Sequence, residues 1–266
     1  MMTLLAAIVL VLVTIPVVAV VVTASYLRVP MRHGSIYEKA QGIWARWLVA
    51  GSGVRTEVHG AEYIERHGAC VYVANHVSWY DVFCLASVLP RWSFVAKAEL
   101  RKIPIFGRGA EAVGTIFVER TNRRAALQMY EAAAVRIREG ASVVVYAEGT
   151  RGDSYALRPF KKGPFVLAIS AGVPIIPVVI MGTREVMRRG RWLVRPGRVH
   201  LHFLPPIQTA GLQYGDRDRL VGEVWTAMAT ALATGYGIQS DRRNVVGADD
   251  AADRTAVAAE AGVSTQ

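Results

Sequence analysis

Cysteine is scarce in this chain of 266 residues, and its scarcity argues against a fold stapled by disulfides. The two cysteines, Cys70 and Cys84, have no CxxC spacing and no histidine placed to complete a zinc site. Both lie in apolar stretches, so we expect buried free thiols in a reducing compartment. A single disulfide between them stays open as the alternative.

Acidic residues are also few, with 21 against 31 lysines and arginines, which gives a net charge of +10. This imbalance favours an anionic partner such as a phospholipid surface, a nucleic acid or a phosphorylated substrate. The sequence has no zinc-finger, helix-turn-helix or RNA-binding signature, so we expect no nucleic-acid partner. The chain is 52% hydrophobic, which is enough for a sizeable core in one large or two small domains.

Charge is missing altogether from residues 4–27. A helix of that length, at about 1.5 Å per residue, can cross a hydrocarbon core of about 30 Å. A cleaved signal peptide is the rival interpretation, because Val22-Thr23-Ala24 resembles a cleavage site, but the charged n-region is missing. We predict a membrane anchor over residues 1–30, and Pro16 keeps a re-entrant insertion open.

The residues after the apolar segment suggest how the chain sits at the membrane. Arg28, Arg32 and Lys39 follow at once, which predicts an inner-membrane protein in which the rest of the chain faces the cytoplasm. Residues 34–51 predict an amphipathic helix, in which two tryptophans favour an interfacial position over one that only covers the core. Its apolar side chains at helical spacing are Ile36, Tyr37, Ala40, Ile43, Trp44, Trp47 and Leu48.

Residues 52–238 alternate β-branched runs with helical patterns. Alternation of this kind predicts a single α/β domain with a mostly parallel central sheet flanked by helices. We predict strands over 54–58, 70–74, 93–96, 115–118, 142–146, 175–180 and 199–203, and helices over 81–88, 122–138, 163–170 and 217–233. Residues 239–266 lose periodicity and carry three arginines against five acids, so we expect a disordered tail.

The stretch VANHVSWYD places His76 and Asp81 directly after a buried-strand pattern. Open α/β sheets bind ligands at this end of their strands. A carboxylate bonded to one ring nitrogen fixes the tautomer and leaves the other nitrogen free as a base. Because no GxSxG elbow is present, we infer that the nucleophile is a hydroxyl of the substrate. The alternative is structural, with Asp81 capping the helix that begins there.

Two further segments end predicted strands in charged residues. GTIFVER covers residues 114–120 and YAEGTR covers residues 146–151. Arg120 and Arg151 at the same edge of a parallel sheet would offer bidentate donors to a phosphate. The alternative is that each arginine only forms an ion pair with the glutamate of its own segment. With a lysine after another strand, the candidate substrate-binding residues are Lys97, Gly114, Glu119, Arg120, Glu148, Gly149, Thr150 and Arg151.

Four blocks in this order resemble the glycerolipid acyltransferase family, which includes the 1-acyl-glycerol-3-phosphate acyltransferases. They are NHxSxxD at residues 75–81, GxxFxxR at 114–120, the FPEGTR block at 146–151 and VPIxPV at 173–178. One block alone is a weak signal, but four in sequence behind an apolar segment are specific. The resemblance covers roughly residues 54–210.

The resemblance implies transfer of a fatty acyl group from acyl-CoA or acyl-carrier protein to the free hydroxyl of 1-acyl-glycerol-3-phosphate, giving phosphatidic acid. His76 would be the general base and Asp81 its orienting partner, with no metal and no bound cofactor. The expected partners are the phospholipid bilayer, a lysophospholipid and a carrier protein. Glu119 stands where the family often has Asp, and Ala147 replaces the usual proline, which leaves the turn before Glu148 less constrained.

Three alternatives remain open at this point. The acceptor could be another lyso-lipid, such as a lyso-ornithine lipid, because the same base need not specify the headgroup. A hydrolase would use His76 to activate water, but a site that faces a membrane and excludes water favours transfer. A non-catalytic membrane-binding protein is supported by charge alone.

Overall fold

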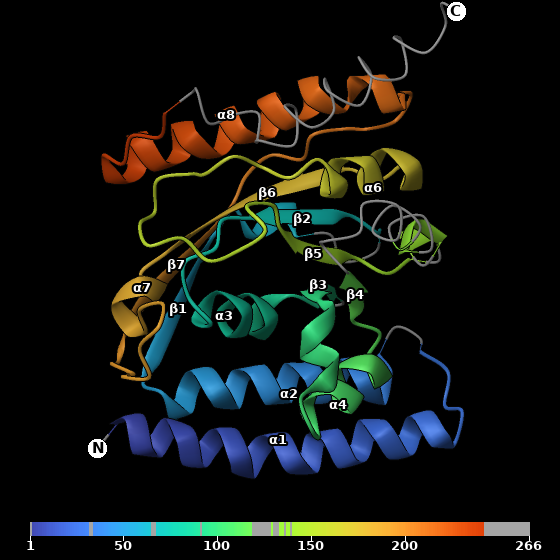
Figure 1. Cartoon of the computed structure of the whole chain (residues 1–266), viewed down its shortest axis with the longest axis vertical. Coiled ribbons are helices and arrows are strands. Elements are labelled where there is room, and N and C mark those ends of the chain that lie inside the picture. The colour runs from blue at the N-terminus through green and yellow to red at the C-terminus, as the bar shows by residue number, and fades with distance from the viewer. Residues whose placement is uncertain are drawn as a thin grey trace, which may run out of the picture.

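The computed structural model describes residues 2–31, 34–64, 68–90, 92–118 and 140–241, together with residues 129, 133–135 and 137–138. The molecule is layered around one sheet (Figure 1). Helices α6 (Gly163–Ala171) and α8 (Arg217–Tyr236) cover one face. Helix α3 (Tyr80–Val88) and then α2 (Ile36–Gly51) cover the other, and α1 (Met2–Tyr26) forms the outermost layer.

The sheet has seven strands in the order β1-β7-β6-β2-β5-β3-β4. Their bounds are β1 Val54–His59, β2 Val71–Ala74, β3 Ser93–Lys97, β4 Ile116–Val118, β5 Val143–Tyr146, β6 Ile175–Met181 and β7 Gly197–Phe203. Neighbours pair in parallel except β6 and β7, which are antiparallel. The predicted α/β class with a mostly parallel sheet flanked by helices is therefore confirmed, and β1 and β7 run against the other five strands.

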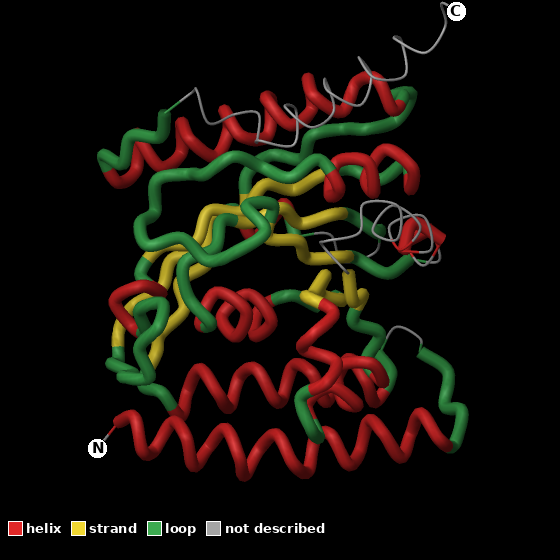
Figure 2. Tube along the Cα trace, viewed as in Figure 1, coloured by secondary structure: helices red, strands yellow, loops and turns green. Residues whose placement is uncertain are grey.

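Several helices are too short to be seen as a periodic pattern in the sequence. These are α4 (Phe106–Ala112), α7 (Thr183–Val186) and the 3-10 helices η1 (Ala61–Tyr63), η2 (Ala98–Lys102) and η3 (Tyr214–Asp216). The helix predicted over residues 122–138 and most of the tail predicted over 239–266 fall outside the described residues. Figure 2 shows how the remaining helices enclose the strands.

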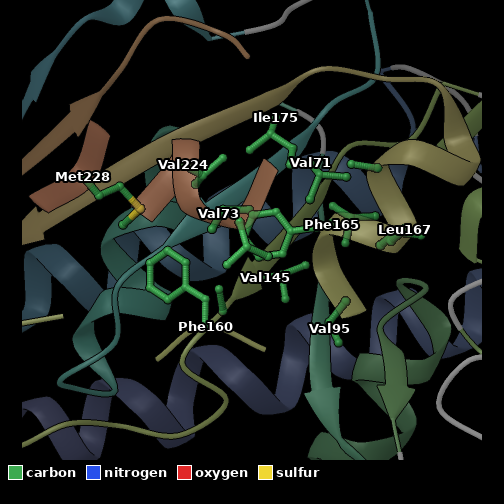
Figure 3. Close-up of a cluster of buried hydrophobic side chains, with 14 of the residues drawn as sticks. Val71, Val73, Val95, Val145, Phe160, Phe165, Leu167, Ile175, Val224 and Met228 are labelled. Atoms are coloured by element: carbon green, nitrogen blue, oxygen red, sulfur yellow. The ribbon is translucent and has the colours of Figure 1, made fainter. Parts of the chain in front are cut away.

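Strand alternation divides the core into two apolar layers. In the first layer, Val71 and Val73 of β2 pack with Phe165 of α6 and with Val224 and Met228 of α8 (Figure 3). The intervening residues face α3 in a second layer, which includes Tyr72, Ala74, Cys84, Leu85, Ile176, Val178 and Leu201. Both faces of β2, β5 and β6 are covered by helices. The sequences of these strands are therefore apolar throughout and do not alternate with polar residues. Cys70 and Cys84 are free thiols.

Helix α1 lies along the domain and does not project from it (Figure 1). Near its start, the backbone N–H of Val194 donates to Oγ1 of Thr3 at 3.1 Å. Halfway along, Nε1 of Trp44 donates to Oγ1 of Thr14 at 2.9 Å. α1 is long and apolar enough to cross a membrane, but only 11% of its most apolar window is buried. Its outer face exposes Leu4, Leu5, Ile8, Leu10, Val11, Leu12, Ile15 and Val20.

The apolar residues of α2 are shared between the domain and the outer surface. Tyr37, Ala40 and Leu48 are buried. Ile43 and Trp47 are 46% and 60% exposed, so they are not covered by the domain. The helix therefore combines the two arrangements that its sequence left open: one side covers the core, and another side presents apolar groups outward.

Candidate active site

The carboxylate of Asp81 organises the loop that follows β2. Nδ1 of His76 and Oδ2 of Asp81 are 2.7 Å apart, and the backbone N–H groups of Val77 and Ser78 donate to the same oxygen at 2.7 and 2.8 Å. Oγ1 of Thr183 donates to Oδ1 at 2.5 Å. Asp81 is completely buried. Because the carboxylate is surrounded by donors, Nδ1 of His76 carries the proton and Nε2 is left as the base.

The suggestion that Asp81 caps its helix is wrong. Asp81 is the second residue of α3, the N-cap position belongs to Trp79, and no side chain makes a capping hydrogen bond there. The carboxylate instead turns back to the loop, where two backbone N–H groups and the imidazole offer it better donors. The carboxylate of Asp81 therefore orients the imidazole of His76 and does not cap α3.

The rest of the loop is fixed to neighbouring elements. The side-chain amide of Asn75 clamps the backbone of Ile180 in β6, accepting its N–H at 2.7 Å and donating to its carbonyl at 3.0 Å. The hydroxyl of Ser78 donates to the carbonyl of Met187 at 2.7 Å. The four specified residues of the NHxSxxD block thus have two roles: His76 and Asp81 form a pair, and Asn75 and Ser78 anchor the loop that carries it.

The imidazole of His76 lies flat against a neighbouring aromatic ring. The rings of His76 and Tyr146 have centroids 4.0 Å apart and an interplanar angle of 18°. The side chain of His76 is 15% exposed. Stacking on one face and the bond to Asp81 leave the imidazole a single orientation, with one edge open to the adjacent cavity.

That cavity has a volume of 330 Å³ and is bounded mostly by apolar side chains. Val17, Val18 and Val21 of α1 form one wall, so the outermost helix contributes to the site. Aromatic side chains form much of the rest, namely Trp44, Trp79, Trp92, Phe94, Phe106, Phe117 and Tyr146. Thr150, Arg151 and Lys97 also line it, so the cavity has cationic groups as well as an apolar interior.

Arg151 lines the same cavity as His76. Its guanidinium carbon lies 4.9 Å from the centroid of the Trp79 ring. Burial lowers the pKa of Arg151, and the neighbouring Arg189 adds to this effect. Arg151 forms no ion pair within the part of the chain that the structure describes. It is suited to receive an anion from outside.

Glu148 is buried next to the pair and is not among the residues that line the cavity. It is 5% exposed, and its Oε1 accepts the backbone N–H of His76 at 3.1 Å. Burial raises the pKa of Glu148 to about 7, against the opposing effects of the His76 N–H and Arg158. Its place in the site is therefore to support the loop of His76.

The other predicted substrate-binding residues are spread around the site. Gly149 and Gly114 have φ angles of 76° and 83°, which explains glycine at both turns. Lys97 lines the cavity but pairs with Glu99, with Nζ and Oε1 2.8 Å apart. Glu119 and Arg120 lie outside the described residues.

Thr183 is the functional candidate that the sequence did not reveal. It is 102 positions from Asp81, it follows β6, and no motif includes it. Only the parallel sheet, which brings the ends of β2 and β6 together, makes the contact visible.

Comparison with known proteins identifies the same region. Residues 55–181 match the family model described as Acyltransferase. The chain is 36% identical to an uncharacterized acyltransferase of Schizosaccharomyces pombe, over 67% of this chain and 65% of the relative. It is 34% identical to a 1-acyl-sn-glycerol-3-phosphate acyltransferase of Limnanthes alba, over 69% of this chain and 64% of the relative. The matches thus span slightly less than two thirds of these relatives.

The fold also matches a solved structure. The 1-acyl-sn-glycerophosphate acyltransferase of Thermotoga maritima superposes with a TM-score of 0.75 at 24% sequence identity, covering 90% of this chain and 97% of that one. The likeness therefore includes more than the segment that the family model matches. On these matches, residues 55–181 are similar to the acyltransferase family, to relatives that include 1-acyl-sn-glycerol-3-phosphate acyltransferases, and the chain shares its fold with the Thermotoga maritima enzyme.

Proposed function

We propose that this protein transfers a fatty acyl group from the thioester of acyl-CoA or acyl-carrier protein to the free hydroxyl of 1-acyl-glycerol-3-phosphate. The observation that carries the proposal is the His76-Asp81 pair, oriented at the edge of an apolar cavity that Arg151 also lines. The product would be phosphatidic acid, and the reaction belongs to phospholipid biosynthesis.

The reaction needs one base that acts twice. Nε2 of His76 takes the proton of the acceptor hydroxyl as its oxygen attacks the thioester carbonyl. The tetrahedral intermediate collapses, the carbon–sulfur bond breaks, and the imidazolium returns its proton to the leaving sulfur. Asp81 stabilises the imidazolium between these steps and keeps Nε2 aimed at the substrate. The products are the ester and a free thiol.

The cavity is lined by two kinds of group, which suit two parts of the substrates. Arg151 offers a planar pair of donors to the phosphate of the acceptor, with Arg120 as its predicted companion. The valines of α1 and the aromatic rings offer an apolar surface to an acyl chain. A cavity of 330 Å³ lies in the size range of ordinary ligand pockets.

The same arrangement supports the proposal that the protein contacts a membrane, with α1 lying in the membrane surface. The start of α1 is bonded to the loop of Val194 through Thr3, and its middle is bonded to Trp44 of α2 through Thr14. The helix therefore cannot cross a bilayer unless the elements packed against it enter the bilayer too. Its exposed apolar face would instead be buried in one leaflet. A lipid acceptor could then reach His76 from the side of α1. The basic residues that follow, Arg28 and Lys39, favour the cytoplasmic leaflet.

The test is an acceptor panel run with purified protein and both donor types. We expect turnover with 1-acyl-glycerol-3-phosphate and none with His76→Ala, whose thermal midpoint should match the parent. Arg151→Gln should raise the KM for the phosphorylated acceptor about tenfold or more and change the KM for the donor little. Faster turnover of a lyso-ornithine lipid would overturn the assigned acceptor, and full activity of His76→Ala would overturn the general base.

A further inference from the structure

The edge of the sheet formed by β1 and β7 carries a group of polar side chains that the proposed reaction does not use. The two strands are parallel, with Glu57 opposite His200 and His59 opposite His202. Residues two apart on a strand point to the same face, so all four side chains share one face of the sheet. We call these four residues the edge cluster.

The edge cluster lies on the opposite face of the sheet from His76. The residues that alternate with these histidines in β7, Val199 and Leu201, point to the other face and pack in the apolar layer on the α3 side. His202 instead reaches α8, where its Nε2 lies 2.5 Å from the hydroxyl of Tyr236. The cavity beside His76 is walled by α1 and α2, which lie on the far side of the sheet (Figure 1).

Three ligand-type atoms of the cluster converge on one point. Nε2 of His59 and Nδ1 of His200 are 3.3 Å apart, and Nδ1 of His200 and Oε2 of Glu57 are also 3.3 Å apart. All three atoms lie within 4.8 Å of one another. Ligand atoms around a tetrahedral Zn²⁺ with bonds of about 2.0–2.1 Å are separated by about 3.3–3.4 Å, so two of the three separations already fit.

Neighbouring side chains hold these groups in place. The ring of His59 stacks on that of His202 with centroids 4.3 Å apart and an interplanar angle of 8°. Nη1 of Arg198 lies 3.3 Å from Oε1 of Glu57, which leaves Oε2 directed at the histidines. Partners of this kind orient metal ligands and set which of their atoms faces the ion.

We propose that Glu57, His59 and His200 bind a divalent transition-metal ion with the preferences of Zn²⁺. Two imidazoles and one carboxylate form a common zinc ligand set, and a fourth position would be open to water because all three side chains reach solvent. A bound ion would fasten the edge strand β1, which follows α2 directly, to β7. The sequence alone predicts no metal here, since ligands on strands about 140 positions apart have no recognisable spacing.

The binding test uses the full chain in detergent, without an affinity tag, titrated with Zn²⁺ against a chromophoric chelator. We expect one equivalent to bind, and His59→Ala and His200→Ala each to weaken binding at least about tenfold. The matched control is His76→Ala, which removes a histidine on the other face and should leave zinc affinity unchanged. Loss of binding in His76→Ala alone, or the same affinity in all variants, would overturn the proposal.

A second measurement avoids variants altogether. In the parent protein, Zn²⁺ should protect His59 and His200 from modification by diethyl pyrocarbonate, while His76 stays as reactive as before; peptide mass spectrometry reads this out. Co²⁺ in place of zinc should give the intense visible absorption of a four-coordinate site. Equal modification of His59 and His200 with and without zinc would show a hydrogen-bonded cluster that binds no metal, and the proposal would fail.

Discussion

At the scale of single residues, the proposed catalytic pair of His76 and Asp81 depends on a carboxylate whose hydrogen-bond partners are donors. Asp81 is completely buried and accepts from an imidazole, two backbone N–H groups and a hydroxyl. Burial of a charge is tolerated when such donors surround it. Among these donors, the hydroxyl of Thr183 comes from a segment distant in sequence, the start of α7 just after β6. Replacing it tests how much the pair depends on this contact across the fold.

Thr183→Val removes that donor while nearly keeping the volume of the side chain. We expect kcat to fall about tenfold or more, because a loss of about 1.4 kcal/mol in positioning equals a factor of ten in rate. KM for both substrates should change little, since Thr183 does not line the cavity. Steady-state kinetics checks this.

Two further variants separate positioning from general damage. Thr183→Ser keeps the hydroxyl and should restore kcat. Thr209→Val removes a buried hydroxyl that donates to the carbonyl of Val173 at 2.8 Å, away from the site, and should leave kcat unchanged. If Thr183→Val and Thr209→Val lose kcat to the same extent, Thr183 has no special place in the site.

We expect Glu148 to make the stability of the protein depend on pH. Its pKa in the folded protein is about 7, raised by burial from an ordinary value of 4.5. Between these two values the folded state holds more protons than the unfolded state, so the free energy of unfolding falls as pH rises. The loss over this window is on the order of 3 kcal/mol, at about 1.4 kcal/mol per pKa unit.

Glu148→Gln removes the titration and keeps an oxygen for the N–H of His76. We expect the thermal midpoint of the variant, relative to the parent, to increase as pH rises from 5 to 7.5. Scanning calorimetry at several pH values measures the difference. A constant difference across this range would mean that Glu148 is already ionised in the folded protein at low pH.

At the scale of elements, the strands were well predicted because each is an apolar run between turn residues. Every predicted strand is present within two residues at either end. The positions of α1 and α4 were not predictable, because packing between segments so far apart leaves no periodicity in the sequence. The contact of Thr183 could not be predicted for the same reason. The pairing of His76 with Asp81 could be predicted, because both residues lie within one short sequence block.

The contact between α1 and α4 depends on a glycine. A Cβ at Gly109 would lie 2.6 Å from Cγ2 of Val18, and both residues line the cavity. Gly109→Ala should therefore push α1 away from α4, at a cost of about 1–3 kcal/mol for overpacking. We expect a lower thermal midpoint together with reduced turnover of long-chain donors.

The matched control is Gly215→Ala, where an added Cβ meets nothing within 4 Å. This variant should keep both the thermal midpoint and the preference for acyl-chain length. Activity with donors of different chain length, measured for both variants, tells whether α1 is part of the acyl-binding wall. If Gly109→Ala lowers turnover equally for short and long donors, the contact only stabilises the fold.

At the scale of the whole molecule, the apolar face of α1 continues into a basic loop. Residues 188–195 include Trp192 and Leu193, which are 80% and 54% exposed. Val194, in the same loop, is the residue bonded to Thr3 at the start of α1. Arg188, Arg191 and Arg195 are exposed around it. An exposed tryptophan among arginines beside an apolar helix is typical of a surface that contacts anionic lipid.

We expect Trp192→Ala combined with Arg191→Ala to lower the fraction of protein bound to vesicles that contain phosphatidylglycerol, since each cation near such a surface contributes about 1 kcal/mol. Binding to pure phosphatidylcholine should fall less, because only the contribution of tryptophan is lost there. Arg219→Ala on α8 is the control: it removes an exposed arginine on the side of the sheet opposite α1 and should not change binding. Sedimentation with vesicles at two salt concentrations measures all three proteins. If Arg219→Ala weakens binding as much as the loop variant does, overall charge holds the protein at the membrane, and the loop next to α1 has no part in setting its orientation.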